Sequence, residues 1–292
     1  MPLVIAAILP HAWTLIPDLD ETAEGASKTL SAMRQAGSAF REAGVEAIVL
    51  AGPHGTRVFN HMSIMDVGRA AGSLTLNGKT VDINVPVDRA LVHAIAESTR
   101  ARGVPVALAG YGGNRPDQAV APLDWGGSVP LWFLGNGSPH EQGLGSVLSP
   151  APKVESVPPV VLITPARGLP RAQMIEFGKA IGEAISADSR RIAFVASCDW
   201  SHVHKESGPY GYDPIAPVMD RTIVDAIEQD AVHRLIDLPQ ADVDRAAIDG
   251  LWQTLMLAGL RDVAPLPSVE LVSYEAPSYF GMIVALYSPS AA

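Results

Sequence analysis

The sequence has little of several features that mark particular protein classes. Its 292 residues include one cysteine, Cys198, so no disulfide can form within the chain and a reducing compartment, the cytoplasm, is expected. Aromatic residues make up only 6%, and no apolar run approaches the ~20 residues that a membrane-spanning helix needs. Residues 1–10 are apolar but lack a basic segment and a small-residue cleavage site, which argues against a signal peptide.

Positive charge is also scarce. There are 21 Lys and Arg against 31 Asp and Glu, which gives a formal net charge of −10 at pH 7. The polyanionic backbone of nucleic acid and the anionic surface of a membrane both repel such a chain. We therefore expect neither as a partner.

Short apolar runs, typical of buried strands, alternate with longer segments that carry apolar residues at helical spacing. We expect strands at 3–9, 46–51, 104–108, 160–164, 192–197, 269–274 and 281–287. We expect helices at 21–43, 86–102, 170–189, 220–236 and 242–260, and a hairpin at 72–85 around Asn77-Gly78. Residues 112–151 are rich in Gly and Pro and are expected to form a long, partly buried loop with one short apolar run at 129–134. This alternation predicts a single α/β domain over residues 1–292, with a mostly parallel central sheet flanked by helices.

Three of the predicted strands end in segments that carry histidine. His11 follows the first strand, His54 follows the strand at 46–51, and His202 follows the strand at 192–197. Ligands of open α/β sheets bind outside the carboxyl ends of the strands, so parallel neighbours would bring these histidines to one pocket. Two histidines and a carboxylate form the Fe(II) site of non-haem oxygenases. The residues alone leave open whether a metal is bound there or the histidines are structural.

Four short segments occur in an order and with a spacing that resemble those of a known family. They are Leu9-Pro10-His11, Gly52-Pro53-His54-Gly55, Leu123-Asp124-Trp125-Gly126 with Val129-Pro130-Leu131, and Asp199-Trp200-Ser201-His202. The family is that of the class III extradiol ring-cleavage dioxygenases, the protocatechuate 4,5-dioxygenase β-subunit superfamily, and the resemblance covers most of the chain. It implies an Fe(II) enzyme that opens a catecholic or aminophenolic ring with O₂. By position, it implies His11 and His54 as Fe(II) ligands and His202 as the acid–base catalyst.

The sequence departs from the family at two places. The family's third ligand is a glutamate on a late helix, whereas the corresponding window here contains Asp249, with Glu275 as the alternative ligand. The family also has a histidine where this chain has Trp125, which cannot titrate and either shapes an aromatic pocket or simply packs. His61 and His204 lie near the motif histidines and are candidates to replace the missing one.

Trp125, Asp199 and Tyr212 are the residues that we expect to bind the small aromatic substrate, and Asp199 is also expected to orient His202. Tyr210 and Arg167 are further candidates for contacting a phenolate or carboxylate. Two other functions stay open. One is a metal-binding or signalling homologue without catalysis, and the other is a zinc-dependent hydrolase, because two histidines and a carboxylate also hold catalytic zinc. A homo-oligomer is expected, and the need for a small accessory subunit is left open.

Overall fold

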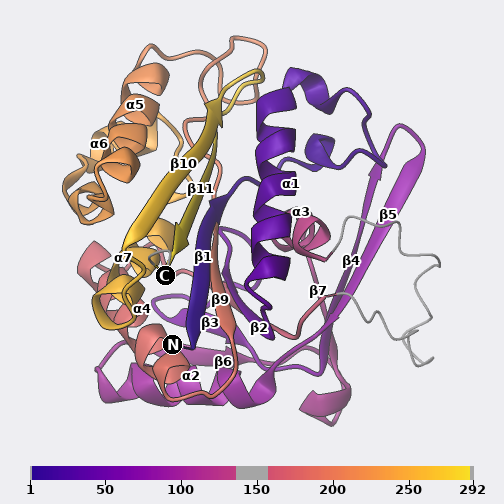
Figure 1. Ribbon diagram of the computed structural model, residues 1–292, viewed down its shortest axis with the longest axis vertical. Coiled ribbons are helices and arrows are strands. Elements are labelled where there is room, and N and C mark those ends of the chain that lie inside the picture. The colour runs from indigo at the N-terminus through magenta and orange to yellow at the C-terminus, as the bar shows by residue number, and fades with distance from the viewer. Residues whose placement is uncertain (1, 136–156, 290–292) are drawn as a thin grey trace.

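The computed structural model describes residues 2–135 and 157–289, and its centre is an eight-stranded sheet (Figure 1). The strands are β1 (Leu3–Leu9), β2 (Ala47–Ala51), β3 (Met62–Met65), β6 (Val106–Ala109), β8 (Val160–Thr164), β9 (Ile192–Ser197), β10 (Ser268–Glu275) and β11 (Met282–Ser288). Their order across the sheet is β10-β11-β1-β9-β2-β8-β3-β6. The central strands β1, β9, β2 and β8 run parallel, while β11 and β3 pair antiparallel with β1 and β8. The predicted α/β fold with a mostly parallel sheet is confirmed.

The central strands are nearly continuous apolar runs because helices cover both of their faces. Every residue of β2, β8 and β9 is buried. One face of the sheet packs against α1 (Ser27–Glu42) and α3 (Trp125–Leu134), and the other against α2 (Arg89–Ala101), α4 (Arg171–Ser186) and α7 (Leu251–Val263). The remaining helices, α5 (Ile215–Glu228) and α6 (Gln240–Arg245), lie beyond the β10 edge (Figure 1). Within the described residues, no helix is both long and apolar enough to cross a membrane.

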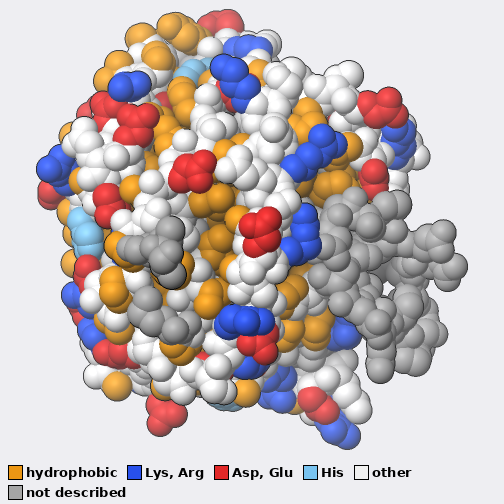
Figure 2. Space-filling model, in the orientation of Figure 1, with side chains coloured by type: hydrophobic (Ala, Val, Ile, Leu, Met, Phe, Trp, Pro, Cys, Tyr) orange, Lys and Arg blue, Asp and Glu red, His pale blue; other side chains and the backbone are white. Residues whose placement is uncertain are grey.

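A second, smaller sheet stands beside the main one. It has the order β5-β4-β7 and consists of β4 (Arg69–Leu76), β5 (Lys79–Pro86) and β7 (Val120–Pro122). The hairpin turn falls at Asn77 and Gly78, as predicted, and both residues have positive φ, which suits the right-handed twist of the two strands. On the face drawn in Figure 2, side chains of both charge signs are interspersed among hydrophobic ones.

The contact between α4 and α7 is unusually close because glycines lie at the crossing. A Cβ added to Gly259 of α7 would lie 1.9 Å from the carbonyl oxygen of Ile175, and one added to Gly178 of α4 would lie 2.0 Å from that of Met256. Neither distance is compatible with a side chain, so only glycine allows the two backbones to approach this far. Helix α7 is thereby held tightly against its neighbour.

Some predicted elements differ in the structure. The prediction of a loop with one apolar run at 129–134 was wrong, because residues 125–134 form α3, which begins at the side-chain cap that Asp124 gives to the backbone N–H of Gly127. Residues 136–151 lie outside the described part of the chain.

The helix expected from residue 21 starts at Ser27, and strand β3 was missed because it is only four residues long. The helical region within 242–260 is divided into α6 and α7 by residues 246–250, and the segment 220–236 into α5 and a 3-10 helix at Val232–Asp237.

Candidate metal centre

The histidine-bearing segments leave the sheet at one edge. In the register of the parallel strands, Leu9 of β1 lies beside Ser197 of β9, and Ala51 of β2 lies beside Ala196 of β9. The chain that follows each strand therefore emerges at the same level. This register brings His11, His54 and the segment 198–202 to the carboxyl ends of the strands, where α/β proteins bind ligands.

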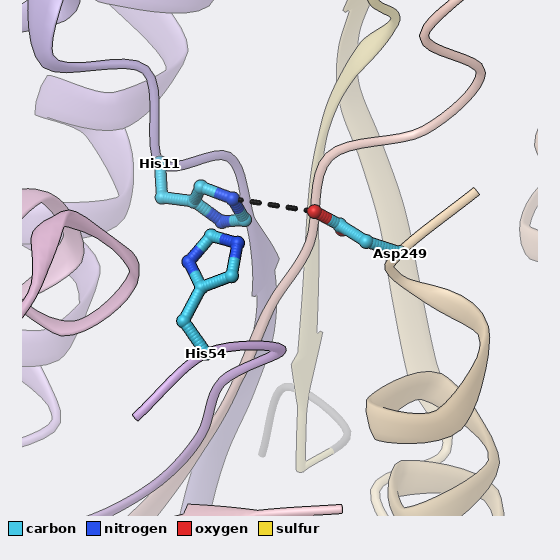
Figure 3. Close-up of side chains that lie close together, drawn as sticks. All are labelled: His11, His54 and Asp249. Carbon is cyan, nitrogen blue, oxygen red and sulfur yellow. Dashed lines mark ion pairs between the residues drawn. The ribbon is translucent and has the colours of Figure 1, made fainter. Parts of the chain in front are cut away.

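His11, His54 and Asp249 form a group that can hold a metal ion (Figure 3). Each offers one ligand atom, and these atoms all lie within 4.8 Å of one another. His11 Nε2 is 3.5 Å from Asp249 Oδ2, and the centroids of the two imidazole rings are 5.1 Å apart. His11 and Asp249 are buried, whereas His54 is partly exposed. Two imidazoles and one carboxylate suit Fe(II) or Zn²⁺, and three protein ligands leave positions open for substrate.

The protonation state of the His11 ring follows from its neighbours. Ser197 Oγ donates its only proton to the carbonyl oxygen of Gly126 at 2.6 Å, and His11 Nδ1 lies 3.0 Å from the same Oγ. Ser197 Oγ must therefore accept the hydrogen bond from His11, which places the ring proton on Nδ1. Nε2 is therefore the His11 nitrogen that faces the carboxylates of the site, and it can ligate a metal once it has lost its own proton.

Pro130 explains why the carbonyl of Gly126 is available to Ser197. In α3 the amide of residue 130 would normally donate to the carbonyl four residues earlier, which is that of Gly126. Proline has no N–H, so this carbonyl needs another donor, and Ser197 supplies it. The buried helix α3 is thus linked through one hydroxyl to the orientation of His11.

Asp249 is oriented by the loop opposite. Its Oδ1 accepts a hydrogen bond from the backbone N–H of Asp199 at 2.9 Å, while Asp199 Oδ1 accepts one from the backbone N–H of His11 at 3.2 Å. The backbone N–H of Gly250 donates to the Asp199 carbonyl at 3.1 Å, which fixes the chain just before α7. Oδ2 of Asp249 is left facing His11. The short aspartate arm reaches the site because residues 246–250 bring the backbone close to β9.

The electrostatics of the site match this arrangement. Burial alone lowers the pKa of His11, but the charges of Asp199 and Asp249 outweigh it and raise this pKa to about 9. Burial, followed by the charge of His11, lowers the pKa of His54 to about 4, so this ring is neutral at pH 7. Burial alone raises the pKa of Asp249, but His11, His202 and Arg167 outweigh it and keep this pKa below its usual value. Within the described residues, Nδ1 of His54 is buried without a hydrogen-bond partner.

His202 lies beside this group. Its Nε2 is 4.0 Å from Asp249 Oδ2, and its ring stacks on Phe280 at 5.5 Å between centroids with an interplanar angle of 24°. Tyr210 and Tyr279 lie against the same ring, with centroids 5.8 Å and 6.0 Å away. The backbone N–H of His202 donates to the carbonyl of Ala246. The imidazole therefore has a fixed position next to the carboxylate, with aromatic rings around it.

All of these side chains open into one cavity of about 960 Å³. Trp125 and Asp199 also line it, and the Trp125 ring lies 4.5 Å from that of His54 between centroids. Tyr212 is not among its lining residues. That side chain is exposed and its backbone forms a bridge with His204, so the tyrosine that this segment contributes to the cavity is Tyr210. The structure therefore does not support the expected substrate contact of Tyr212.

The other candidates from the sequence lie away from the donor atoms. Glu275 Oε1 accepts the backbone N–H of Thr29 at 2.6 Å, so this carboxylate caps the first turn of α1 and is not part of the metal group. His204 Nε2 pairs with buried Asp220 at 2.8 Å. His61 is exposed and bonds to a nearby backbone carbonyl. Neither histidine lines the cavity, so neither takes the place of the family histidine.

Several cavity residues were not found by sequence reasoning. Trp13, Arg57, Trp252, Tyr279 and Phe280 all line the cavity. Trp252 follows Asp249 by one helical turn, which was the only local signal for it. The others come from loops whose positions depend on how distant segments pack, and no periodicity marks them.

Comparisons with known proteins agree with this geometry. A family model described as the catalytic LigB subunit of aromatic ring-opening dioxygenase matches residues 5–285. The chain is 23% identical over 275 residues to Protein CA_C1420 of Clostridium acetobutylicum, a match that covers 92% of this chain and 54% of that protein. The chain thus spans about half the length of this curated relative.

A solved structure shares the fold. The crystal structure of uncharacterized protein JW3007 from Escherichia coli K12 matches with a TM-score of 0.58 and 15% identity, over 97% of this chain and 99% of that one. At this identity the likeness concerns the fold alone. The family model, in contrast, extends over the sheet, the histidine segments and α7 together. The chain therefore belongs to the family of the catalytic LigB subunit of aromatic ring-opening dioxygenases.

Proposed function

We propose that the protein is a non-haem Fe(II)-dependent extradiol dioxygenase that cleaves a catecholic or aminophenolic ring with O₂. One observation carries the proposal: His202 Nε2 lies 4.0 Å from Oδ2 of Asp249, beside a group of two histidines and one carboxylate. This arrangement joins an acid–base residue to a donor set of the kind that holds Fe(II) in oxygenases. Membership of the LigB family supports the same reaction class.

In this proposal, separate residues bind the metal and transfer protons. Bound Fe(II) would supply the redox chemistry that allows O₂ to react with the ring. His11, His54 and Asp249 would hold it, with the Nδ1 proton of His11 fixed by Ser197. His202 accepts the proton of a substrate hydroxyl as general base and returns a proton when the ring opens.

The cavity favours a flat aromatic substrate. Trp13 and Trp125 meet edge to face at 5.7 Å between centroids, with Trp125 against His54, and the His202–Phe280 stack lies beside Asp249. Aromatic walls bind a planar ring through stacking and remove water from it. The donor set beside these rings gives the substrate hydroxyls polar partners at the metal group.

The reducing compartment predicted from the single cysteine suits Fe(II), and Cys198 is buried and free. The cytoplasmic location and a homo-oligomer belong to the proposal as predictions, and the need for a small accessory subunit is left open. Size measurement of the purified protein would show whether the chain assembles.

The test is anaerobic loading of the purified protein with Fe(II) or Zn²⁺, followed by exposure to air with a panel of catechols and aminophenols. We expect O₂ uptake and an absorbing ring-opened product with Fe(II) only. Hydrolysis of ester or amide substrates by the zinc-loaded protein would support the hydrolase instead. Binding of metal and aromatic ligand without turnover of any panel member would support a non-catalytic homologue.

The role of His202 is tested in the same assay with His202→Asn. We expect turnover to fall by about 100-fold to 10,000-fold while the bound iron is unchanged, because the residue moves protons and is not in the metal group. The matched control is His61→Asn, which alters an exposed histidine outside the cavity. Undiminished turnover by His202→Asn would remove this residue as the base.

A further inference from the structure

Asp220 is a buried carboxylate of α5 that lies outside the metal group, and its side chain is 0% exposed. Its Oδ1 accepts a hydrogen bond from the backbone N–H of Ser201 at 3.0 Å. Its Oδ2 accepts one from the hydroxyl of Tyr274 at 3.0 Å and lies 2.8 Å from Nε2 of His204. Taking a carboxylate out of water costs free energy, so these contacts are needed to keep it buried.

Two of the three donors flank the proposed base. Ser201 directly precedes His202, and His204 follows it by two residues, so Asp220 holds the segment on either side of the imidazole. The third donor, Tyr274, lies on β10, which Figure 1 shows beside α5. Burial, followed by the charge of Asp220, raises the pKa of the Tyr274 hydroxyl, which therefore keeps its proton and donates it.

Gly281 packs directly against this carboxylate. A Cβ added to Gly281 would lie 2.0 Å from Asp220 Oδ2, so only glycine allows this approach. The backbone N–H of Gly281 donates to the carbonyl of Ser201 at 3.1 Å. Gly281 directly follows Phe280, whose ring stacks on the imidazole of His202. One carboxylate thus contacts the residue before His202 and the residue after Phe280.

Within the described residues, no hydrogen bond orients the imidazole of His202. Its Nδ1 is buried without a partner, and its Nε2 is 4.0 Å from Asp249 Oδ2, beyond hydrogen-bond distance. The direction of the ring therefore depends on the backbone of its own segment and on the Phe280 ring beside it. Misplacement of a reacting group by about 1 Å can cost on the order of 100-fold in rate.

We propose that Asp220 is a positioning residue for His202, which holds this base against Phe280 by fixing the neighbour of each in the chain. The proposal rests on the proposed function, because it concerns the residue assigned there as general base. Asp220 does not line the cavity. Loss of its charge therefore slows proton transfer and leaves the binding of metal and substrate almost intact.

The central variant is Asp220→Asn, assayed as the Fe(II)-loaded protein with the panel of catechols and aminophenols. The asparagine oxygen can still accept the Ser201 N–H, but the amide nitrogen cannot accept from Tyr274 or His204. We expect kcat to fall about 10-fold to 100-fold. We expect KM and bound iron to stay within about twofold of the unaltered protein, which separates a slower reaction step from weaker binding.

His204 offers a second pair of variants at a partly exposed position. In His204→Gln the amide nitrogen can take the place of Nε2 and donate to Asp220, whereas in His204→Leu no donor remains. We expect kcat to stay within about threefold of the unaltered value in His204→Gln and to fall about tenfold in His204→Leu. This pair decides the question if Asp220→Asn does not fold.

NMR of the imidazole protons in the metal-free protein tests the position of His202 without any turnover. The ring stacks on Phe280 at 5.5 Å between centroids, so the ring current of Phe280 displaces its carbon-bound proton signals. His202→Asn identifies these signals by their loss. We expect the displacement to shrink in Asp220→Asn and in His204→Leu, and to be kept in His204→Gln.

The control for lost stability is Ile227→Ala. Ile227 is a buried residue of α5 about two helical turns after Asp220, and its truncation leaves a cavity in the core. We expect the Tm to fall in this variant while kcat, measured below the unfolding transition, and the His202 signals stay unchanged.

Unchanged kcat in Asp220→Asn, or equal kcat in the two His204 variants, would overturn the proposal. So would His202 signals that keep their positions in Asp220→Asn. A fall in kcat that Ile227→Ala reproduces at the same loss of Tm would show a purely structural role, which also overturns it. If the His202 signals move as expected but the unaltered protein turns over no catechol, the positioning role stands and the dioxygenase proposal fails.

Discussion

Ser197 fixes the ring of His11 by accepting a hydrogen bond from its Nδ1 at 3.0 Å. It can only accept, because its own proton goes to the carbonyl of Gly126 at 2.6 Å. A strand residue 186 positions away from His11 in the sequence therefore decides which imidazole nitrogen of His11 faces the site.

Ser197→Ala removes the acceptor of the Nδ1 proton and lets the His11 ring change tautomer or turn. We expect affinity for Fe(II) or Zn²⁺ to fall by about 10-fold to 100-fold, which is the usual loss when the partner of a ligating histidine is removed. Metal affinity is measured by competition with a chelator. Ser201→Ala is the matched control, because this serine is equally buried and its Oγ has no partner among the described residues. Similar losses in both variants would contradict the assignment.

Asp249→Asn should lower metal affinity by on the order of 100-fold or more, because the neutral amide is a poor ligand while the hydrogen bond at Oδ1 can be kept. Glu275→Ala should leave metal affinity unchanged. It should instead lower the free energy of unfolding by about 1 kcal/mol, since Glu275 caps the first turn of α1. The two variants are compared by metal titration and by chemical denaturation. Loss of metal in Glu275→Ala with retention in Asp249→Asn would reverse the choice of ligand.

Metal binding should release about one proton at pH 7. The pKa of His11 is raised to about 9 in the metal-free protein, so its ring carries two protons at neutral pH, and the metal must displace the one on Nε2. The pKa of His54 is about 4, so this ligand has no second proton to lose. Affinity should rise about tenfold per pH unit between pH 7 and pH 9. Calorimetry in buffers of different ionisation enthalpy measures the released proton.

The same pKa of His11 affects stability without metal. Its folded value of about 9 lies above the ordinary value of 6.5, so its contribution is fully present below pH 6.5 and is lost as the pH rises to 9. We expect the Tm of the metal-free protein to fall over this range and that of the metal-loaded protein to change less. A Tm of the metal-free protein that rises from pH 6.5 to pH 9 would contradict the assigned charge state.

Trp125→Ala should raise the pKa of His54 from about 4 toward 6.5, because burial is the main cause of the low value and the Trp125 ring covers the imidazole at 4.5 Å. The titration is followed by NMR of the imidazole signals in the metal-free protein. Trp13→Ala is the control, since Trp13 packs against Trp125 and should affect His54 less. An unchanged pKa of His54 in Trp125→Ala would show that other groups exclude water from the imidazole ring.

The sequence predicted the sheet well because its central strands are short apolar runs with a clear polar end. It also placed His11 and His54 at one edge, since parallel strands that share a register must end together. The main error in the fold was the loop expected over residues 125–134. Residues 125–134 were not expected to form a helix because they contain two glycines and Pro130, which are poor helix formers, and burial of residues 126–134 outweighs this.

The side chains around the histidines were harder to predict. Tyr210 rather than Tyr212 reaches the cavity, and nothing in the local sequence of that turn distinguishes them. Ser197 acts through a partner that is distant along the chain, the carbonyl of Gly126. Contacts of this kind depend on tertiary packing, which has no periodic pattern in the sequence.

The glycine crossing of α4 and α7 has a consequence for engineering the protein. Asp249 precedes α7, and α7 cannot shift along α4 without a collision between backbones at Gly178 or Gly259. The carboxylate is therefore anchored by a part of the molecule that never touches a ligand. Libraries aimed at new substrates can vary the cavity walls freely while leaving this crossing alone, whereas random mutagenesis should lose activity at these two glycines as often as at the site itself.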